Sequence, residues 1–141
     1  MLGVRYRYQA YNGTGVSVTV TVKDITFKFA SDGSLTFSAE TAHISAVSVS
    51  TASYSNATSV DNSTNKYLGS DITWTAAPGS SATGTVSIYL QRSTDGGTTW
   101  PSDGQGEFIS GISFSASSTS VRKNAKVRQG GMAMNPYDAP W

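Results

Sequence analysis

Few side chains in this chain could carry acid–base or nucleophilic chemistry, and they are scattered. Asp95 has the most suggestive neighbours, but glycoside hydrolysis needs a second carboxylate at a set distance, and the chemistry of a tight turn explains this residue fully. His43 is the only histidine, and no serine lies in the glycine pattern of a nucleophile elbow that would make it a partner for His43. We therefore predict that the protein is not an enzyme.

The same residues make a poor metal site. The chain has no cysteine, so a site built on His43 would need carboxylate ligands. Glu40 is three residues away, which on a strand places it on the opposite face, and we expect His43 to lie on a strand surface. The run Asp103-Gly104-Gln105-Gly106-Glu107 offers oxygen ligands, but calcium loops usually supply more acids. We predict a glycine-rich hairpin tip there, and no metal or other cofactor.

The composition describes one domain with little charge. The 141 residues carry a formal net charge of +1, and only 13% of them are charged, which argues against nucleic acid as a partner. No stretch is apolar enough to span a membrane, and the residues after Met1 lack the apolar run of a signal peptide. Abundant Ser and Thr, with 14 glycines, favour short strands with polar outer faces over long helices.

The alternation of apolar and polar residues predicts an all-β chain. Its cleanest runs are residues 3–10 and 16–22, and the turn signal Asn12-Gly13 between them predicts that the two strands pair as a hairpin. Residues 25–29 continue the alternation in the opposite phase, which predicts a bulge or turn at Lys23-Asp24.

Short strands separated by turn signals predict an antiparallel β-sandwich over residues 1–121, with about seven to nine strands in an Ig-like or jelly-roll topology. Residues 50–66 are dominated by Ser, Thr and Asn. We expect them to form a long polar loop on the surface.

Residues 93–100 follow a strand and read Ser-Thr-Asp-Gly-Gly-Thr-Thr-Trp. Asp bonds its own backbone two residues on, glycine accepts the positive φ of tight turns, and the tryptophan ring can cover the turn. The spacing resembles the Asp box of sialidases and many other β-proteins. The resemblance implies a stapled β-hairpin away from any catalytic site. Its structural turn residues would be Ser93, Asp95, Gly97, Thr99 and Trp100.

The character of the chain changes after Val121. Neither strand alternation nor helix periodicity is evident, so residues 122–141 are predicted to form an extended C-terminal arm that docks on a partner. Its basic half would seek an acidic protein surface, and its distal half would fill apolar pockets. The arm residues assigned to partner binding are Arg122, Lys123, Lys126, Arg128, Met132, Met134, Tyr137 and Trp141.

The run from Gly84 to Arg92, together with residues 93–104 that follow it, resembles β-domains of small accessory proteins in tailed-bacteriophage particles. The resemblance implies a non-enzymatic structural protein in the virion, made in the bacterial cytoplasm. Such a protein decorates or cements the capsid, or sits on the tail or neck. Its partners would be other virion proteins, including further copies of itself in an oligomer or lattice.

The alternative is a carbohydrate-binding β-sandwich module, as on a tail fibre or a secreted enzyme. Tyr6, Tyr8 and Tyr89 alternate along predicted strands, and exposed tyrosines could stack on sugars. An exposed aromatic platform would favour this second class.

Overall fold

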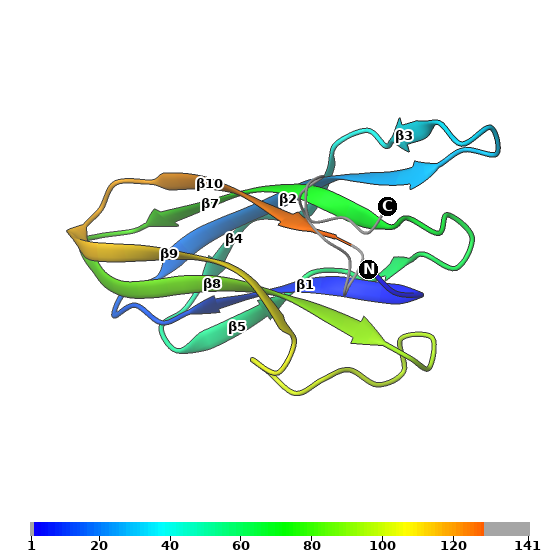
Figure 1. Ribbon diagram of the computed structural model, residues 1–141. Coiled ribbons are helices and arrows are strands. Elements are labelled where there is room, and N and C mark those ends of the chain that lie inside the picture. Colours follow the sequence, from blue (N-terminus) through cyan, green and yellow to red (C-terminus); the bar gives the residue numbers. More distant parts are fainter. Residues whose placement is uncertain (1, 129–141) are drawn as a thin grey trace.

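The computed structural model describes residues 2–128, which form two antiparallel sheets packed face to face. Sheet A contains β1 (Arg5–Asn12), β5 (Ser53–Asn56), β6 (Val60–Asp61), β8 (Ala82–Ser93) and β9 (Glu107–Ser117). Sheet B contains β2 (Val18–Phe29), β3 (Leu35–Phe37), β4 (Thr41–Val49), β7 (Gly69–Pro78) and β10 (Val121–Val127). The order in sheet A is β5-β1-β8-β9, with β6 also on β1, and in sheet B it is β10-β7-β2-β3, with β4 also on β2 (Figure 1).

This arrangement confirms the predicted all-β sandwich. The described residues contain ten strands, more than expected, because two of them lie within the predicted loop and one within the predicted arm. Residues 2–128 include no helix that is long and apolar enough to cross a membrane.

The core lies between the sheets and follows directly from the alternation. Tyr6, Tyr8 and Ala10 point inward from β1, and Val18, Val20 and Val22 point inward from β2. Each large apolar side chain buried in this way contributes about 1.5–3 kcal/mol. The other large side chains of the core include Ile72, Trp74, Ile88, Leu90, Ile112 and Phe114.

The predicted hairpin between the first two strands is wrong. β1 pairs with β5, β6 and β8, whereas β2 pairs with β3, β4 and β7, so the chain crosses from one sheet to the other after Asn12. The fully buried Asn12 holds this crossover. Its amide nitrogen donates to the carbonyls of Val16 (2.7 Å) and Val49 (2.9 Å), and its oxygen accepts from the Thr14 amide. The turn signal was real, but it marks a change of sheet.

The predicted bulge at Lys23-Asp24 does not interrupt the pairing of β2 with β7, which keeps its register from Val18 to Phe27. The only irregularities along β2 are with β4, between Val20 and Lys23. Because the pleat continues, Asp24 lies on the buried face and the apolar residues after it lie on the outside. The change of phase therefore shows that the apolar side chains move from the inner face of β2 to its outer face.

The long polar loop predicted over residues 50–66 is also corrected. It contains β5 and β6, which add to the same edge of β1 at its two ends. The buried Asn62 ties the segment down, since its amide nitrogen donates to the carbonyls of Gly3 (2.9 Å) and Tyr67 (3.0 Å). The segment is polar because its strands lie at the edge of sheet A and because the Asn62 amide satisfies backbone carbonyls.

The predicted arm does not begin at residue 122. β10 pairs with β7 residue by residue from Val121 to Val127 and forms one edge of sheet B. An edge strand needs little apolar alternation, and lysines on it discourage pairing with other chains. The distal arm residues Met132, Met134, Tyr137 and Trp141 lie outside the described residues.

Candidate functional site

The Asp-box segment forms the first part of the loop between β8 and β9, and its acid is used within that loop. Asp95 Oδ1 accepts hydrogen bonds from Ser93 Oγ (2.7 Å) and the amides of Thr98 (3.1 Å) and Thr99 (2.9 Å). Oδ2 accepts from Thr99 Oγ1 (2.6 Å). Gly97 has φ +96° and donates its amide to Ser93 Oγ (2.8 Å), while Trp100 Nε1 donates to the Gly97 carbonyl (3.1 Å).

These bonds decide what Asp95 can do. The hydrogen bonds from Thr99, then from Ser93 and Thr98, hold the pKa of this carboxyl well below its usual range. A carboxylate kept ionised at neutral pH cannot serve as a general acid. The geometry therefore assigns Asp95 to the turn.

The rest of the loop lies over the outer face of sheet A. Gln9 is fully buried there, and its amide nitrogen donates to Asn56 Oδ1 and Asp103 Oδ1, both at 2.7 Å, while its oxygen accepts from the Gly104 amide (3.0 Å). The Arg7 guanidinium lies 4.4 Å from the Trp100 ring centroid. Two glutamines on a sheet exterior are thus sealed beneath a loop, since Gln91 is also fully buried and donates to the Pro101 carbonyl (3.0 Å).

The two acids of residues 103–107 are not brought together. Asp103 accepts from Gln9, and Glu107 forms an ion pair with Arg92 at 2.6 Å. Within residues 2–128, no group of three or more His, Cys, Asp or Glu residues is placed to hold a metal ion.

Beside the loop, four rings on sheet A form what we call the aromatic platform: Tyr11, Tyr54, Tyr89 and Phe108. The Tyr11 and Tyr54 ring centroids lie 4.6 Å apart with the planes tilted by 32°, and Tyr89 and Phe108 meet edge to face at 5.9 Å. Desolvation, with the nearby Tyr11, Tyr89 and Asp103, raises the pKa of the Tyr54 hydroxyl. Of the three tyrosines considered from sequence, only Tyr89 belongs here.

Tyr6 and Tyr8 are buried between the sheets, so the idea that they stack on sugars is wrong. Tyr8 instead joins a polar cluster inside the core. Its hydroxyl donates to Asp24 Oδ2 (2.6 Å) and lies 2.8 Å from Ser70 Oγ, and His43 Nε2 lies 2.7 Å from Asp24 Oδ1. Burial, then Asp24, raises the pKa of the Tyr8 hydroxyl well above its ordinary value.

This buried cluster corrects the expected surface position of His43, whose side chain is only 6% exposed. The order of contacts is Ser70, Tyr8, Asp24, His43. In a Ser-His-Asp triad the imidazole must stand between the hydroxyl and the carboxylate. Here the carboxylate stands between the other groups, so His43 is not placed to activate Ser70.

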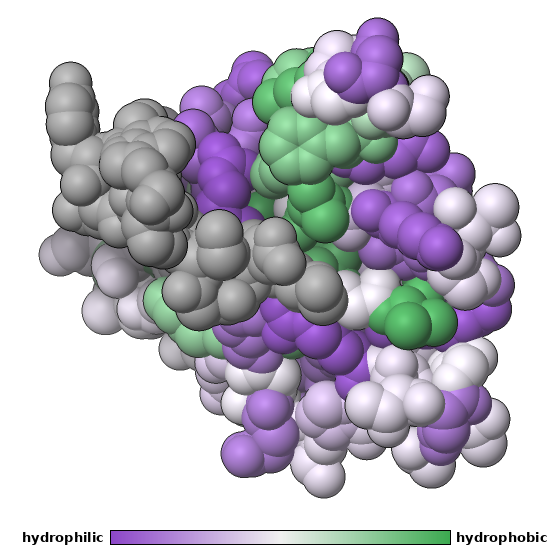
Figure 2. Space-filling view, turned by 45° about the vertical axis from the view of Figure 1, so that its right-hand side comes forward, coloured by the Kyte–Doolittle hydropathy of each residue, from purple (hydrophilic) through white to green (hydrophobic). Residues whose placement is uncertain are grey.

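The outer face of sheet B carries a group of five large apolar side chains that the sequence did not predict there. We call it the phenylalanine face: Ile25, Phe27, Phe29, Leu35 and Phe37. Phe29 is 63% exposed and Phe37 60% exposed. The strand register places Phe27 opposite Phe37 and Phe29 opposite Leu35, so β2 and β3 present one continuous apolar surface. Figure 2 shows hydrophobic side chains gathered in the upper part of the molecule, at the height of this hairpin.

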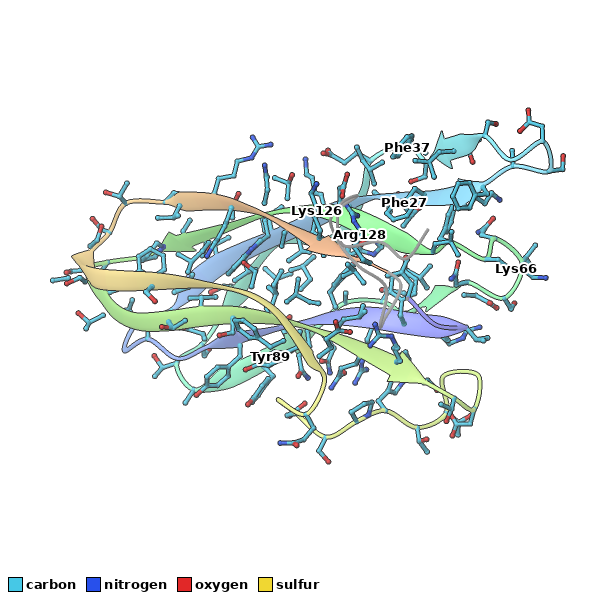
Figure 3. The ribbon with its side chains drawn as sticks, viewed as in Figure 1. Phe27, Phe37, Lys66, Tyr89, Lys126 and Arg128 are labelled. Carbon is cyan, nitrogen blue, oxygen red and sulfur yellow. The ribbon has the colours of Figure 1, made fainter. Side chains whose placement is uncertain are left out.

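Basic side chains surround the phenylalanine face. The Arg128 guanidinium lies 5.1 Å from the Phe27 ring centroid and pairs with Asp71 at 3.0 Å. Figure 3 shows Phe27, Phe37, Lys66 and Arg128 toward the same end of the sandwich. A shallow hollow of about 390 Å³ adjoins Phe29 and is lined in part by Lys28 and Lys66.

The structure divides the basic residues that the sequence grouped. Arg128 lies over Phe27 in the phenylalanine face. Lys126 lines a different hollow, together with Gly111 and Phe108. Arg122, six residues from Arg128 and so roughly 20 Å away along the strand, lines a hollow with Thr21 and Glu40. Lys123 donates to the Gly111 carbonyl on β9 at 2.8 Å. These four cations therefore do not form one patch.

The phenylalanine face and the buried cluster share one signal in the sequence, which is the phase reversal within β2. An uninterrupted strand would have predicted both, with Asp24 inside and residues 25–29 outside.

Comparison with protein-family models, with curated proteins and with solved structures finds no match to this chain.

Proposed function

We propose that this chain is a non-enzymatic structural component of a tailed-phage particle, and that it attaches to neighbouring virion proteins through the phenylalanine face. The observation that carries the proposal is the exposure of Phe29 and Phe37 on paired strands at one end of the sandwich. Contiguous exposed apolar patches on a protein surface mark interaction sites.

The phenylalanine face has the chemistry of the centre of an interface. Fully burying a phenylalanine or leucine is worth about 1.5–3 kcal/mol, so covering the three most exposed side chains, Phe29, Leu35 and Phe37, would supply several kcal/mol toward docking. Aromatic residues are enriched and lysines depleted at interface centres, with polar groups at the rim. The surface fits this pattern, because rings occupy its middle and Lys28, Lys66 and Arg128 lie around it.

The basic side chains around the phenylalanine face restrict the chemistry of the partner surface. The cations around the phenylalanine face favour a partner surface whose apolar contact is bordered by carboxylates. This retains the acidic partner predicted for the basic residues, but it moves the docking surface from an arm to a folded edge of sheet B. Assignment to a phage particle is supported by the resemblance carried by residues 84–104.

Particle incorporation tests the proposal. Phe29→Ser with Phe37→Ser should leave the sandwich folded, because both side chains are already largely exposed, and should remove the protein from purified particles. Phe108→Ser is the matched control, since Phe108 is 58% exposed on the other sheet and should have no effect on incorporation. Normal incorporation of the double variant would refute docking through this face, and a genome neighbourhood without portal or capsid genes would refute the phage assignment.

A further inference from the structure

The aromatic platform has no role in the proposed docking, because it lies on the outer face of sheet A while the phenylalanine face lies on the outer face of sheet B. Figure 3 shows Tyr89 on the sheet opposite Phe27 and Phe37. The two surfaces can therefore be occupied at the same time, and the platform needs its own explanation.

The platform crosses the whole width of sheet A. In the register, Tyr54 on β5 is opposite Tyr11 on β1, and Tyr89 on β8 is opposite Phe108 on β9. Four adjacent strands span three spacings of about 4.8 Å, or roughly 14 Å. Next to Tyr11 in the same row are the small residues Ser87 and then Gly111. The Phe108 ring lies over Gly111, where a Cβ would stand 3.5 Å from it.

A polar edge adjoins these rings. Asp103 is exposed, and only its Oδ1 atom is engaged, by Gln9, among the contacts of the described residues. Gly104, with φ +73°, brings the loop against Tyr54, since a Cβ there would lie 2.8 Å from the Tyr54 hydroxyl. The Tyr54 hydroxyl and the Asp103 carboxylate therefore border the rings from the same side.

Rings bordered by a carboxylate and a hydroxyl suit a ligand that is apolar on one face and polar at its rim. A pyranose has this character, because its C–H face packs on an aromatic ring while its hydroxyls donate to acceptors beside it. We propose that the aromatic platform binds carbohydrate, with Phe108 and Tyr54 as the stacking residues and Asp103 as the hydroxyl acceptor. Its width favours a short oligosaccharide over a single sugar.

The charges near the platform point to a neutral glycan. Asp103 would repel an acidic sugar. Three of the nearby cations are already engaged, because Arg7 donates to Gln91 and lies on Trp100, Arg92 pairs with Glu107, and Lys123 donates to the Gly111 carbonyl. A fourth, Lys126, lines a hollow that Phe108 also borders.

The test is binding of the full chain to an array of neutral and sialylated glycans, followed by titration calorimetry with the best neutral oligosaccharide. We expect binding to neutral glycans only. Phe108→Ser should weaken it at least about tenfold with an unchanged melting temperature, and Tyr54→Ala should weaken it as much while the protein stays folded. Asp103→Asn should admit acidic glycans. Phe37→Ser, equally exposed on the other sheet, should bind like the wild type.

An array without a neutral glycan signal would overturn the inference. So would full affinity in both Phe108→Ser and Tyr54→Ala, or an equal loss in Phe37→Ser. The readout uses the isolated protein, so its failure leaves docking through the phenylalanine face untouched, and a failure of particle incorporation leaves glycan binding untouched.

Discussion

Asp24→Ala tests whether the polar cluster between the sheets supports the fold. Asp24 is 2% exposed and accepts from the Tyr8 hydroxyl at 2.6 Å, and it lies 2.7 Å from His43 Nε2. A hydrogen bond to a charged group is worth about 1.5–3 kcal/mol, and a buried group left without its partner costs about 1–3 kcal/mol. Tyr8 keeps Ser70, so His43 is the group left without its partner.

We therefore expect Asp24→Ala to lower the free energy of unfolding by about 3–5 kcal/mol, a large share of the 5–15 kcal/mol typical of a domain. Urea unfolding measures it, followed by tryptophan fluorescence, to which the buried Trp74 contributes. Asp71→Ala is the matched control. It removes the Arg128 pair, whose acid is 47% exposed, and should cost less than about 1 kcal/mol. Equal small losses in both variants would refute the claim that the cluster supports the core.

Three further outcomes are expected. The pKa of Asp95 is lower in the folded protein than its ordinary value of 3.8, so the ionised carboxylate stabilises the fold fully above pH 3.8 and this stabilisation is lost as the pH falls further. The difference in unfolding free energy between wild type and Asp95→Asn should therefore shrink in acid. A difference that does not change with pH would contradict this. The pKa values of Tyr6 and Tyr8 are raised by burial, so their stabilisation is present below pH 10 and lost above it; an ultraviolet titration should show two tyrosines that ionise only as the protein unfolds, and smooth ionisation of all seven would refute their burial. Ala116 has φ +49° in β9, a backbone conformation that glycine adopts more easily, so Ala116→Gly should stabilise the protein by up to about 1 kcal/mol and raise its melting temperature. Ala125→Gly in the regular strand β10 should lower the melting temperature. A lowered melting temperature for Ala116→Gly would contradict the assigned strain.

The sheets could be predicted from sequence because the inward positions of β1, β2, β7 and β8 alternate strongly. The pairing of β1 with β8 could not, because it joins residues far apart in the chain, whereas Asn12-Gly13 is a local signal. That signal describes only how the backbone turns. Whether the next strand returns to the same sheet depends on the buried contacts of Asn12 with Val16 and Val49.

The candidate surfaces were harder to predict for two physical reasons. Alternation shows which residues share a face but not which face is buried, so a buried Asp24 followed by the half-buried Phe27 and the exposed Phe29 looks in the sequence like a break in the strand. Edge strands such as β10 are held by backbone hydrogen bonds to one neighbour, and their side chains carry little pattern. The Asp-box turn was accessible from sequence because its hydrogen bonds are local.

The most direct test of the account is photo-crosslinking from position 37 in assembled particles. A photoreactive phenylalanine analogue replaces Phe37 in one variant and Phe108 in the other, two side chains of similar exposure on opposite sheets. Docking through the phenylalanine face predicts a crosslink from position 37 to a neighbouring virion protein and none from position 108. Particles that contain the protein but yield no crosslink from position 37 would contradict the proposed docking surface.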